Sequence, residues 1–166
     1  MSTKTASVQL DGEHLRFTGR TGSGHRIVLD EAAGDAGPRP AELVPLALAG
    51  CTAMDVISIL RKKRQVIERY EVRASSRQLD DPPAIFTRID LVHDVTGADV
   101  DIEAVRRAIE LSATRYCAVG ATLAAGDTVI HHTYVVRRGS DEPITGEVCV
   151  LGPSGRHELQ VMPAVG

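Results

Sequence analysis

The sequence predicts an α+β protein in which two helices cover an antiparallel sheet. Segments with alternating polar and apolar residues, typical of strands, occur at the start, in the middle and towards the end of the chain. Two segments with apolar residues at helical spacing, near 41–63 and 101–117, interrupt them. The resulting order βββ-α-ββ-α-β is typical of the α+β class. With 166 residues, 43% of them hydrophobic, the chain can bury a core as one domain.

Three short strands are expected first, at residues 7–10, 14–18 and 25–29. The Asp-Gly pair at 11–12 is a strong signal for a hairpin turn between the first two strands. Residues 31–40 contain several glycines and prolines, so they are expected to form a connector without regular structure.

Residues 41–63 are expected to form a long helix that is apolar on every face and therefore buried. Pro45 removes one backbone donor, so it should bend this helix or loosen its first turn. The apolar part, 43–60, is about long enough to span a bilayer, but it contains Asp55. A carboxylate at the centre of a membrane costs about 2.5–3.5 kcal/mol. The sequence therefore favours a core helix, with no membrane partner.

The second half of the chain is expected to add a hairpin, a second helix and a further strand. The expected elements are strands at 71–77 and 85–95, joined by a turn at 80–83, a helix from a cap at Asp99 or Asp101 to about Cys117, a turn at 121–123 and a strand at 128–136. On the strand at 85–95, Ile89, Leu91 and His93 should point to one face of the sheet and Arg88 and Asp90 to the other.

We expect two parts in the chain, a main domain at 1–138 and a C-terminal extension at 139–166. Strand-like segments at 147–151 and 157–161 flank the turn residues 152–155, so the extension is expected to form a β-hairpin. Because an isolated hairpin is barely stable in water, it should dock on something or move freely.

Composition and charge exclude several classes of function. With 19 Lys and Arg against 22 Asp and Glu, the net charge is −3, so no basic surface attracts nucleic acid or an anionic membrane. The three cysteines form no CxxC pair, which argues against both a disulfide scaffold and a zinc site. The N-terminus lacks an apolar run typical of a secretion signal. A cytoplasmic protein without metal or bound cofactor is expected.

Cys51 is the most informative residue for chemistry. It lies in the most apolar segment and is flanked by small residues, in Ala-Gly-Cys-Thr-Ala. One interpretation is packing, since free cysteine is among the most buried residue types. The other is redox chemistry with Cys117, which would approach Cys51 if the two helices pack on one sheet. A second thiol traps a sulfenic acid as a disulfide before it is oxidised further.

Several short motifs together resemble the OsmC/Ohr family. They are Pro-Arg-Pro-Ala-Glu-Leu-Val at 38–44, Gly-Cys-Thr-Ala-Met-Asp-Val at 50–56, Leu-Arg-Lys-Lys-Arg-Gln at 60–65, Ile-Glu-Leu-Ser at 109–112 and Tyr-Cys at 116–117. The similarity covers about residues 8–137. It implies an OsmC-like fold, with antiparallel sheets covering two central helices, and an intertwined homodimer with active sites at the subunit interface.

The resemblance also implies thiol-dependent reduction of organic hydroperoxides. Cys51 matches the peroxidatic position of the family and Cys117 matches the resolving position. The implied partners are a second subunit, a small hydroperoxide and an external dithiol or lipoyl-type reductant. A non-catalytic or weakly active small-molecule-binding stress protein is the alternative function, and a structural dimer with packed cysteines is a third.

Two departures from the family pattern concern the groups around the thiol. Better-known members carry a glutamate directly after the proline, where this chain has Ala41; Glu42 is one residue later, about 100° around the helix. Glu42 is either a catalytic residue or a first-turn residue that favours the helix dipole. The thiolate-stabilising arginine has two candidates, Arg20 and Arg39. A cysteine needs such a cation for fast attack on a peroxide.

Other polar residues have weaker signals. Asp55 lies one turn after Cys51. It could hold an arginine or histidine, or accept a hydrogen bond from a buried backbone donor. An unpaired carboxylate there would oppose ionisation of the Cys51 thiol. His131 and His132 should point to opposite faces of a strand, which argues against joint metal binding. Neither His25 nor Cys149 is assigned a role.

Overall fold

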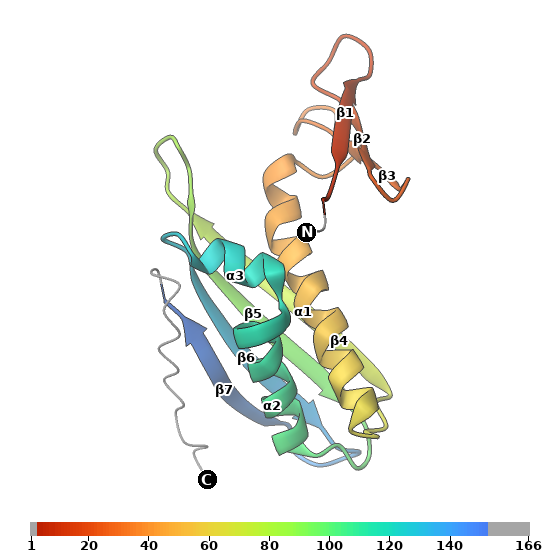
Figure 1. Cartoon of the computed structure of the whole chain (residues 1–166), viewed down its shortest axis with the longest axis vertical. Helices are drawn as coiled ribbons and strands as arrows, with labels where there is room; N and C mark the ends of the chain where they lie inside the picture. Colours follow the sequence, from red (N-terminus) through yellow and green to blue (C-terminus); the bar gives the residue numbers. More distant parts are fainter. Residues whose placement is uncertain (1–2, 153–166) are drawn as a thin grey trace. The chain divides into compact units, whose positions relative to one another are not determined.

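A computed structural model of the chain describes residues 3–152 and confirms the α+β class (Figure 1). The chain divides into two compact units, residues 1–44 and 45–166. A three-stranded sheet lies in the first unit, and a four-stranded sheet with the long helices lies in the second.

The N-terminal unit is an antiparallel meander of three strands, β1 (Ala6–Leu10), β2 (Phe17–Thr21) and β3 (Arg26–Leu29). β2 begins three residues later than expected, because the loop closes with Asp11 N–H donating to the Arg16 carbonyl, 2.8 Å away. The connector then leads to a single 3-10 turn, η1 (Pro40–Glu42).

The second unit contains a mixed sheet in the order β4 (Arg69–Gln78), β5 (Phe86–Thr96), β6 (Val129–Arg137) and β7 (Ile144–Leu151). The outer pairs are antiparallel as expected, but β5 and β6 are parallel. This corrects the expectation of a wholly antiparallel sheet. The reason is the connection: the helical segment between β5 and β6 crosses back over the sheet, and such a crossover joins parallel strands.

Helix α1 (Leu43–Lys62) follows η1 directly, so the loosened first turn expected from Pro45 is a 3-10 turn ahead of the α-helix. The expectation that α1 is buried on every face was wrong. Leu48, Val56 and Leu60 are fully buried against the sheet, whereas Leu46 and Met54 are 62% and 74% exposed. A single sheet covers only one side of a helix. By length and composition alone the segment Pro40–Lys62 could cross a membrane, a test that core helices also pass.

Helix α2 (Ile102–Leu111) is capped by Asp101, whose carboxylate accepts the Glu103 N–H at 3.0 Å. It does not continue to Cys117 as an α-helix: a π-helical turn, η2 (Ser112–Tyr116), follows it. The turn expected at 121–123 is instead part of a helix, α3 (Ala118–Ala124). Cys117 has extended backbone at the junction, because its sulfur caps α3 by accepting the Gly120 N–H at 3.3 Å.

The segment expected as the first strand of a C-terminal hairpin lies within β7, which pairs with β6. This part of the extension therefore completes the main sheet. The strand expected at 157–161 lies outside the described residues.

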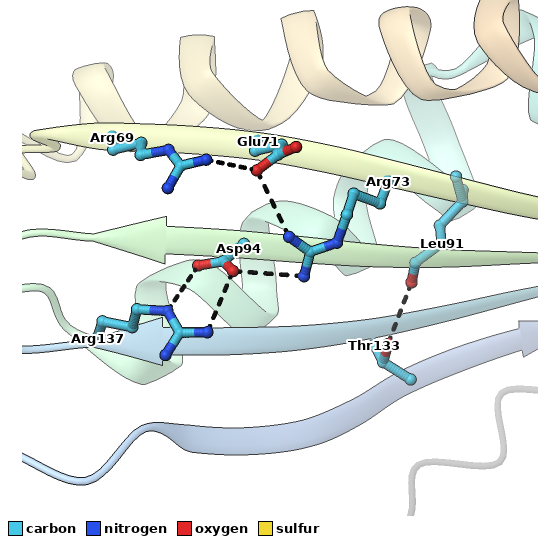
Figure 2. Close-up of polar contacts among 7 residues, drawn as sticks. All are labelled: Arg69, Glu71, Arg73, Leu91, Asp94, Thr133 and Arg137. Carbon is cyan, nitrogen blue, oxygen red and sulfur yellow. Dashed lines mark hydrogen bonds and ion pairs between the residues drawn. The ribbon is translucent and has the colours of Figure 1, made fainter.

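The face of the sheet away from the helices carries a network of charged residues (Figure 2). Asp94 accepts from Arg137 at 3.2 and 3.3 Å and from Arg73 at 3.4 Å, and Glu71 joins Arg73 to Arg69. Burial would raise the pKa of Asp94, but the two arginines outweigh it and hold that pKa below its usual value. This outer face is thus polar and self-paired.

Candidate functional site

Two sulfur atoms and a carboxylate meet between α1 and the start of α3. Cys51 and Asp55 are four residues apart, so they share one face of α1. Cys117 reaches them from the junction before α3. The ligand atoms of all three side chains lie within 4.8 Å of one another. Cys117 is 3% exposed and Cys51 is half-buried, and neither is in a disulfide. The structure therefore brings together the two cysteines that the sequence singled out.

A short chain of hydroxyl groups fixes the carboxylate. The Ser112 hydroxyl donates to Asp55 Oδ2 at 3.0 Å, and Thr52 Oγ1 lies 3.0 Å from Ser112 Oγ. Because the single Ser112 proton goes to Asp55, Thr52 must be the donor to Ser112. Both hydroxyl residues are fully buried. The partner of Asp55 is thus a serine of η2, neither the arginine or histidine nor the backbone donor considered from the sequence.

Cys117 is held as a neutral thiol. Burial, followed by its interaction with Cys51 and the charge of Asp55, raises the pKa of Cys117 to about 12, while the Gly120 N–H acts in the opposite direction. At neutral pH this sulfur therefore carries its proton. The two thiols consequently differ: one is buried and protonated, and the other is partly open to solvent.

A surface pocket of about 340 Å³ adjoins the cluster at Asp55. Its other lining residues are Ser58, Ile59, Lys62, Leu111 and Tyr116. This volume is within the range of small-molecule sites, and the lining combines apolar side chains with one cation and one carboxylate. A small, partly apolar molecule would fit beside the cluster.

A second polar group is buried under the helices. The Tyr70 hydroxyl lies 2.8 Å from His93 Nδ1, and His93 Nε2 lies 3.2 Å from His132 Nδ1. Burial, then the charge of Asp55, raises the pKa of Tyr70. Burial lowers the pKa of both histidines, to about 4 for His132, so both rings are neutral at pH 7. The sequence did not indicate this hydrogen-bonded group, although the alternation along 85–95 placed His93 on the same face as Ile89 and Leu91.

A family model described as OsmC-like protein matches residues 33–132. The chain belongs to the OsmC-like protein family. It is 43% identical to Protein YhfA of Escherichia coli K12 over 124 residues, which cover 75% of this chain and 92% of that protein.

Solved structures share the OsmC-like fold. An OsmC-like protein from Mycoplasma pneumoniae superposes with a TM-score of 0.72 at 15% identity, over 82% of this chain and 99% of the other. An organic hydroperoxide resistance protein from Elizabethkingia anophelis gives 0.58 at 16% identity, over 84% and 98%. At such identities the likeness concerns the fold.

Three other residues suggested by the OsmC-like pattern lie in the N-terminal unit, apart in sequence from the cluster. Glu42 lies in the first turn of η1, and its carboxylate accepts the Arg39 N–H at 2.8 Å. The Arg39 guanidinium pairs with Asp35 at 3.5 Å and with Glu42 at 3.6 Å. Arg20 is exposed on β2. Their part in thiol chemistry stays a prediction.

The four-stranded sheet contains His131, His132 and Cys149, and His25 lies in the N-terminal unit. His131 contacts Asp90 and Glu147 on the outer face, while His132 faces the core, which confirms that the pair points in opposite directions. Cys149 is fully buried on β7; burial, with the charges of Glu110 and Glu147, raises its pKa to about 12. His25 is exposed.

Proposed function

We propose that this OsmC-like protein is a thiol-dependent peroxidase that reduces organic hydroperoxides. The observation that carries the proposal is the pair of free thiols in unequal surroundings, with their sulfur atoms within 4.8 Å. Peroxide reduction needs an accessible sulfur for attack and a second sulfur in reach to resolve the product. Cys51, half-buried, has the first role, and Cys117, buried and protonated, has the second.

In the first step the Cys51 thiolate attacks the outer oxygen of R–O–O–H. The O–O bond breaks, Cys51 becomes a sulfenic acid, and the leaving alkoxide takes a proton to form the alcohol. In the second step the Cys117 sulfur attacks the Cys51 sulfur and loses its proton. Water leaves, and a disulfide joins the two residues. An external dithiol then reduces this disulfide and returns both thiols, so the protein needs no bound cofactor.

The protein is proposed to act as a homodimer in a reducing compartment such as the cytoplasm. Leu46, Gly50 and Met54 follow one another at four-residue spacing along the exposed side of α1. A side chain added at Gly50 would meet nothing within 4 Å, so another backbone can approach closely there. An exposed apolar stripe on a helix next to the reactive cysteine is suited to a second subunit.

The test is peroxide consumption by the reduced protein with an organic hydroperoxide and dithiothreitol. We expect Cys51→Ser to abolish consumption. With dithiothreitol left out, Cys117→Ser should consume one equivalent in a single turnover but form no internal disulfide. Cys149→Ala is the matched control and should keep the wild-type rate, because Cys149 lies outside the cluster. Undiminished turnover in Cys51→Ser would refute the proposal.

A second candidate function is binding of a small molecule without efficient catalysis. Among residues 45–152 the hydrogen bonds and ion pairs include none from an arginine or lysine to Cys51 or Cys117, and fast attack needs a cation near the thiolate. The pocket beside Asp55 would then be the binding site. If the wild-type protein consumes no hydroperoxide, this function replaces the first.

A further inference from the structure

We infer that Cys51, Asp55 and Cys117 form a binding site for a thiophilic divalent metal ion, with Zn²⁺ as the representative ion. Their donor atoms, two sulfurs and a carboxylate oxygen, lie within 4.8 Å of one another. Two thiolates and one carboxylate are ligands that Zn²⁺ accepts, at about 2.3 Å for sulfur and 2.0–2.2 Å for oxygen. The site uses the residues of the proposed function, but metal binding does not depend on peroxidase activity.

The spacing of the donor atoms fits a single ion. Two sulfurs bound tetrahedrally to one Zn²⁺ lie roughly 3.8 Å apart, given bonds of about 2.3 Å. The cluster, at 4.8 Å or less, is within about 1 Å of that arrangement, a change that side-chain rotation can supply. Cys51 and Asp55 present their donors from successive turns of one helix, as paired ligands at i and i+4 do in other zinc sites.

The groups around the cluster suit a metal site as well. Ser112 donates to Asp55 Oδ2, and the Gly120 N–H donates to Cys117 Sγ, so two of the three ligands are oriented by hydrogen bonds. Such outer contacts commonly fix the ligands of a metal. Thr52 holds Ser112 in turn. The third ligand, Cys51, is half-buried and leaves the cluster open to an entering ion.

Charge balance favours the ion when both thiols are ionised. Two thiolates and a carboxylate carry three negative charges within a few ångströms, and a divalent cation offsets two of them. On binding, each thiol gives its proton to the solvent. Three protein ligands leave a fourth position for water or a small anion, on the side of the pocket that Asp55 shares with Lys62. A bound ion would also hold both sulfurs and so prevent the disulfide from forming.

The sequence predicted no metal site because its cysteines have no CxxC spacing. The structure supplies the ligands differently, with two from successive turns of α1 and the third from 62 residues after Asp55 in the chain. Local spacing does not reveal a site that tertiary packing assembles.

The test is a titration of the reduced, metal-free, full-length protein with Cd²⁺, followed by its thiolate-to-metal charge-transfer absorbance, and then displacement by Zn²⁺. We expect one ion per chain. Cys51→Ser and Cys117→Ser should each lose the band, and Asp55→Asn should bind more weakly. Cys149→Ala and Asp99→Asn, which change the same residue types elsewhere, should bind like the wild type.

Ser112→Ala keeps all three ligands and is the sharper variant. Loss of an outer contact of this kind weakens metal binding by about 10- to 100-fold, so this variant should show the band only at higher Cd²⁺. Circular dichroism establishes that each variant is folded. The inference is overturned if the folded wild type gives no band at stoichiometric Cd²⁺, or if the band survives in Cys51→Ser. The Cd²⁺ titration contains no peroxide, so its result does not depend on peroxidase activity. A wild-type protein that binds Cd²⁺ but consumes no hydroperoxide would refute the proposed peroxidase function and still support the metal site.

Discussion

The buried histidine pair predicts that the protein loses stability in mildly acidic solution. His93 and His132 are 0% and 1% exposed, and their ring nitrogens lie 3.2 Å apart. Protonating either ring would place a charge in the core beside a second ring, with no carboxylate bonded to the pair among the described residues. Folding therefore keeps both rings neutral, whereas in the unfolded chain they protonate at their ordinary pKa near 6.5.

The size of the effect follows from the depressed pKa. Burial, then the charge of His131, lowers the pKa of His132 from 6.5 to about 4. A group whose pKa is lowered on folding does not reduce the free energy of unfolding above pH 6.5. As the pH falls from 6.5 towards 4, the free energy of unfolding decreases, because only the unfolded state takes up the proton. Each pKa unit corresponds to about 1.36 kcal/mol, so His132 alone accounts for about 3 kcal/mol between pH 7 and pH 4. His93, whose pKa is also lowered, adds to this loss.

The assay is urea unfolding at a series of pH values from 7 to 4.5. For each variant, the free energy of unfolding at lower pH is compared with its own value at pH 7. We expect His132→Gln to reduce the acid-induced loss by about 2–3 kcal/mol, since glutamine does not titrate. His131→Gln, on the outer face, should reduce it much less, because the charge of His131 is the smaller of the two causes that lower the pKa of His132. Asp90 and Asp94, with pKa values held below their usual 3.8, act only at lower pH. An equal loss in wild type and His132→Gln would refute this reasoning.

Two further outcomes are expected. Met54→Lys should convert the proposed homodimer to monomer in sedimentation experiments, because it places a charge in the middle of the apolar stripe on α1. Ala121→Lys, on the exposed side of α3, should leave the proposed dimer intact, and a wild-type monomer would contradict the proposal. Asp101→Ala should lower the free energy of unfolding by about 1 kcal/mol through loss of the α2 cap, whereas Asp99→Ala should change it little; equal effects would show that Asp101 is not the cap.

The side chains of the site come from two segments of the fold. Cys51 and Asp55 belong to α1, while Cys117 and Ser112 belong to the irregular segment after α2. The π turn and the Cys117 sulfur, which caps α3 by accepting the Gly120 N–H, give this segment its shape. A change in the segment should therefore alter both the proposed thiol chemistry and the proposed metal binding, whereas a change at Cys149 should alter neither.

Much of the site could be predicted from the sequence because its evidence is local. Cys51 within an apolar helix, and Cys117 after a second amphipathic segment, were identified by their immediate neighbours. The hydroxyl of Ser112 as partner of Asp55 could not be predicted, since 57 residues separate them. The same holds for His93 and His132, which are 39 residues apart and meet only across two paired strands.

The sequence by itself determined most classes of element, with α3 as an exception, the inward and outward faces of β5 and the two cysteines worth testing. Periodicity and local composition record these properties, because each depends on residues a few positions apart. Only the tertiary structure decided that β5 and β6 run parallel, that one side of α1 stays uncovered, and that two thiols and a carboxylate share one small volume. These features depend on how distant segments pack, which the free energy of the whole fold selects and no single segment encodes.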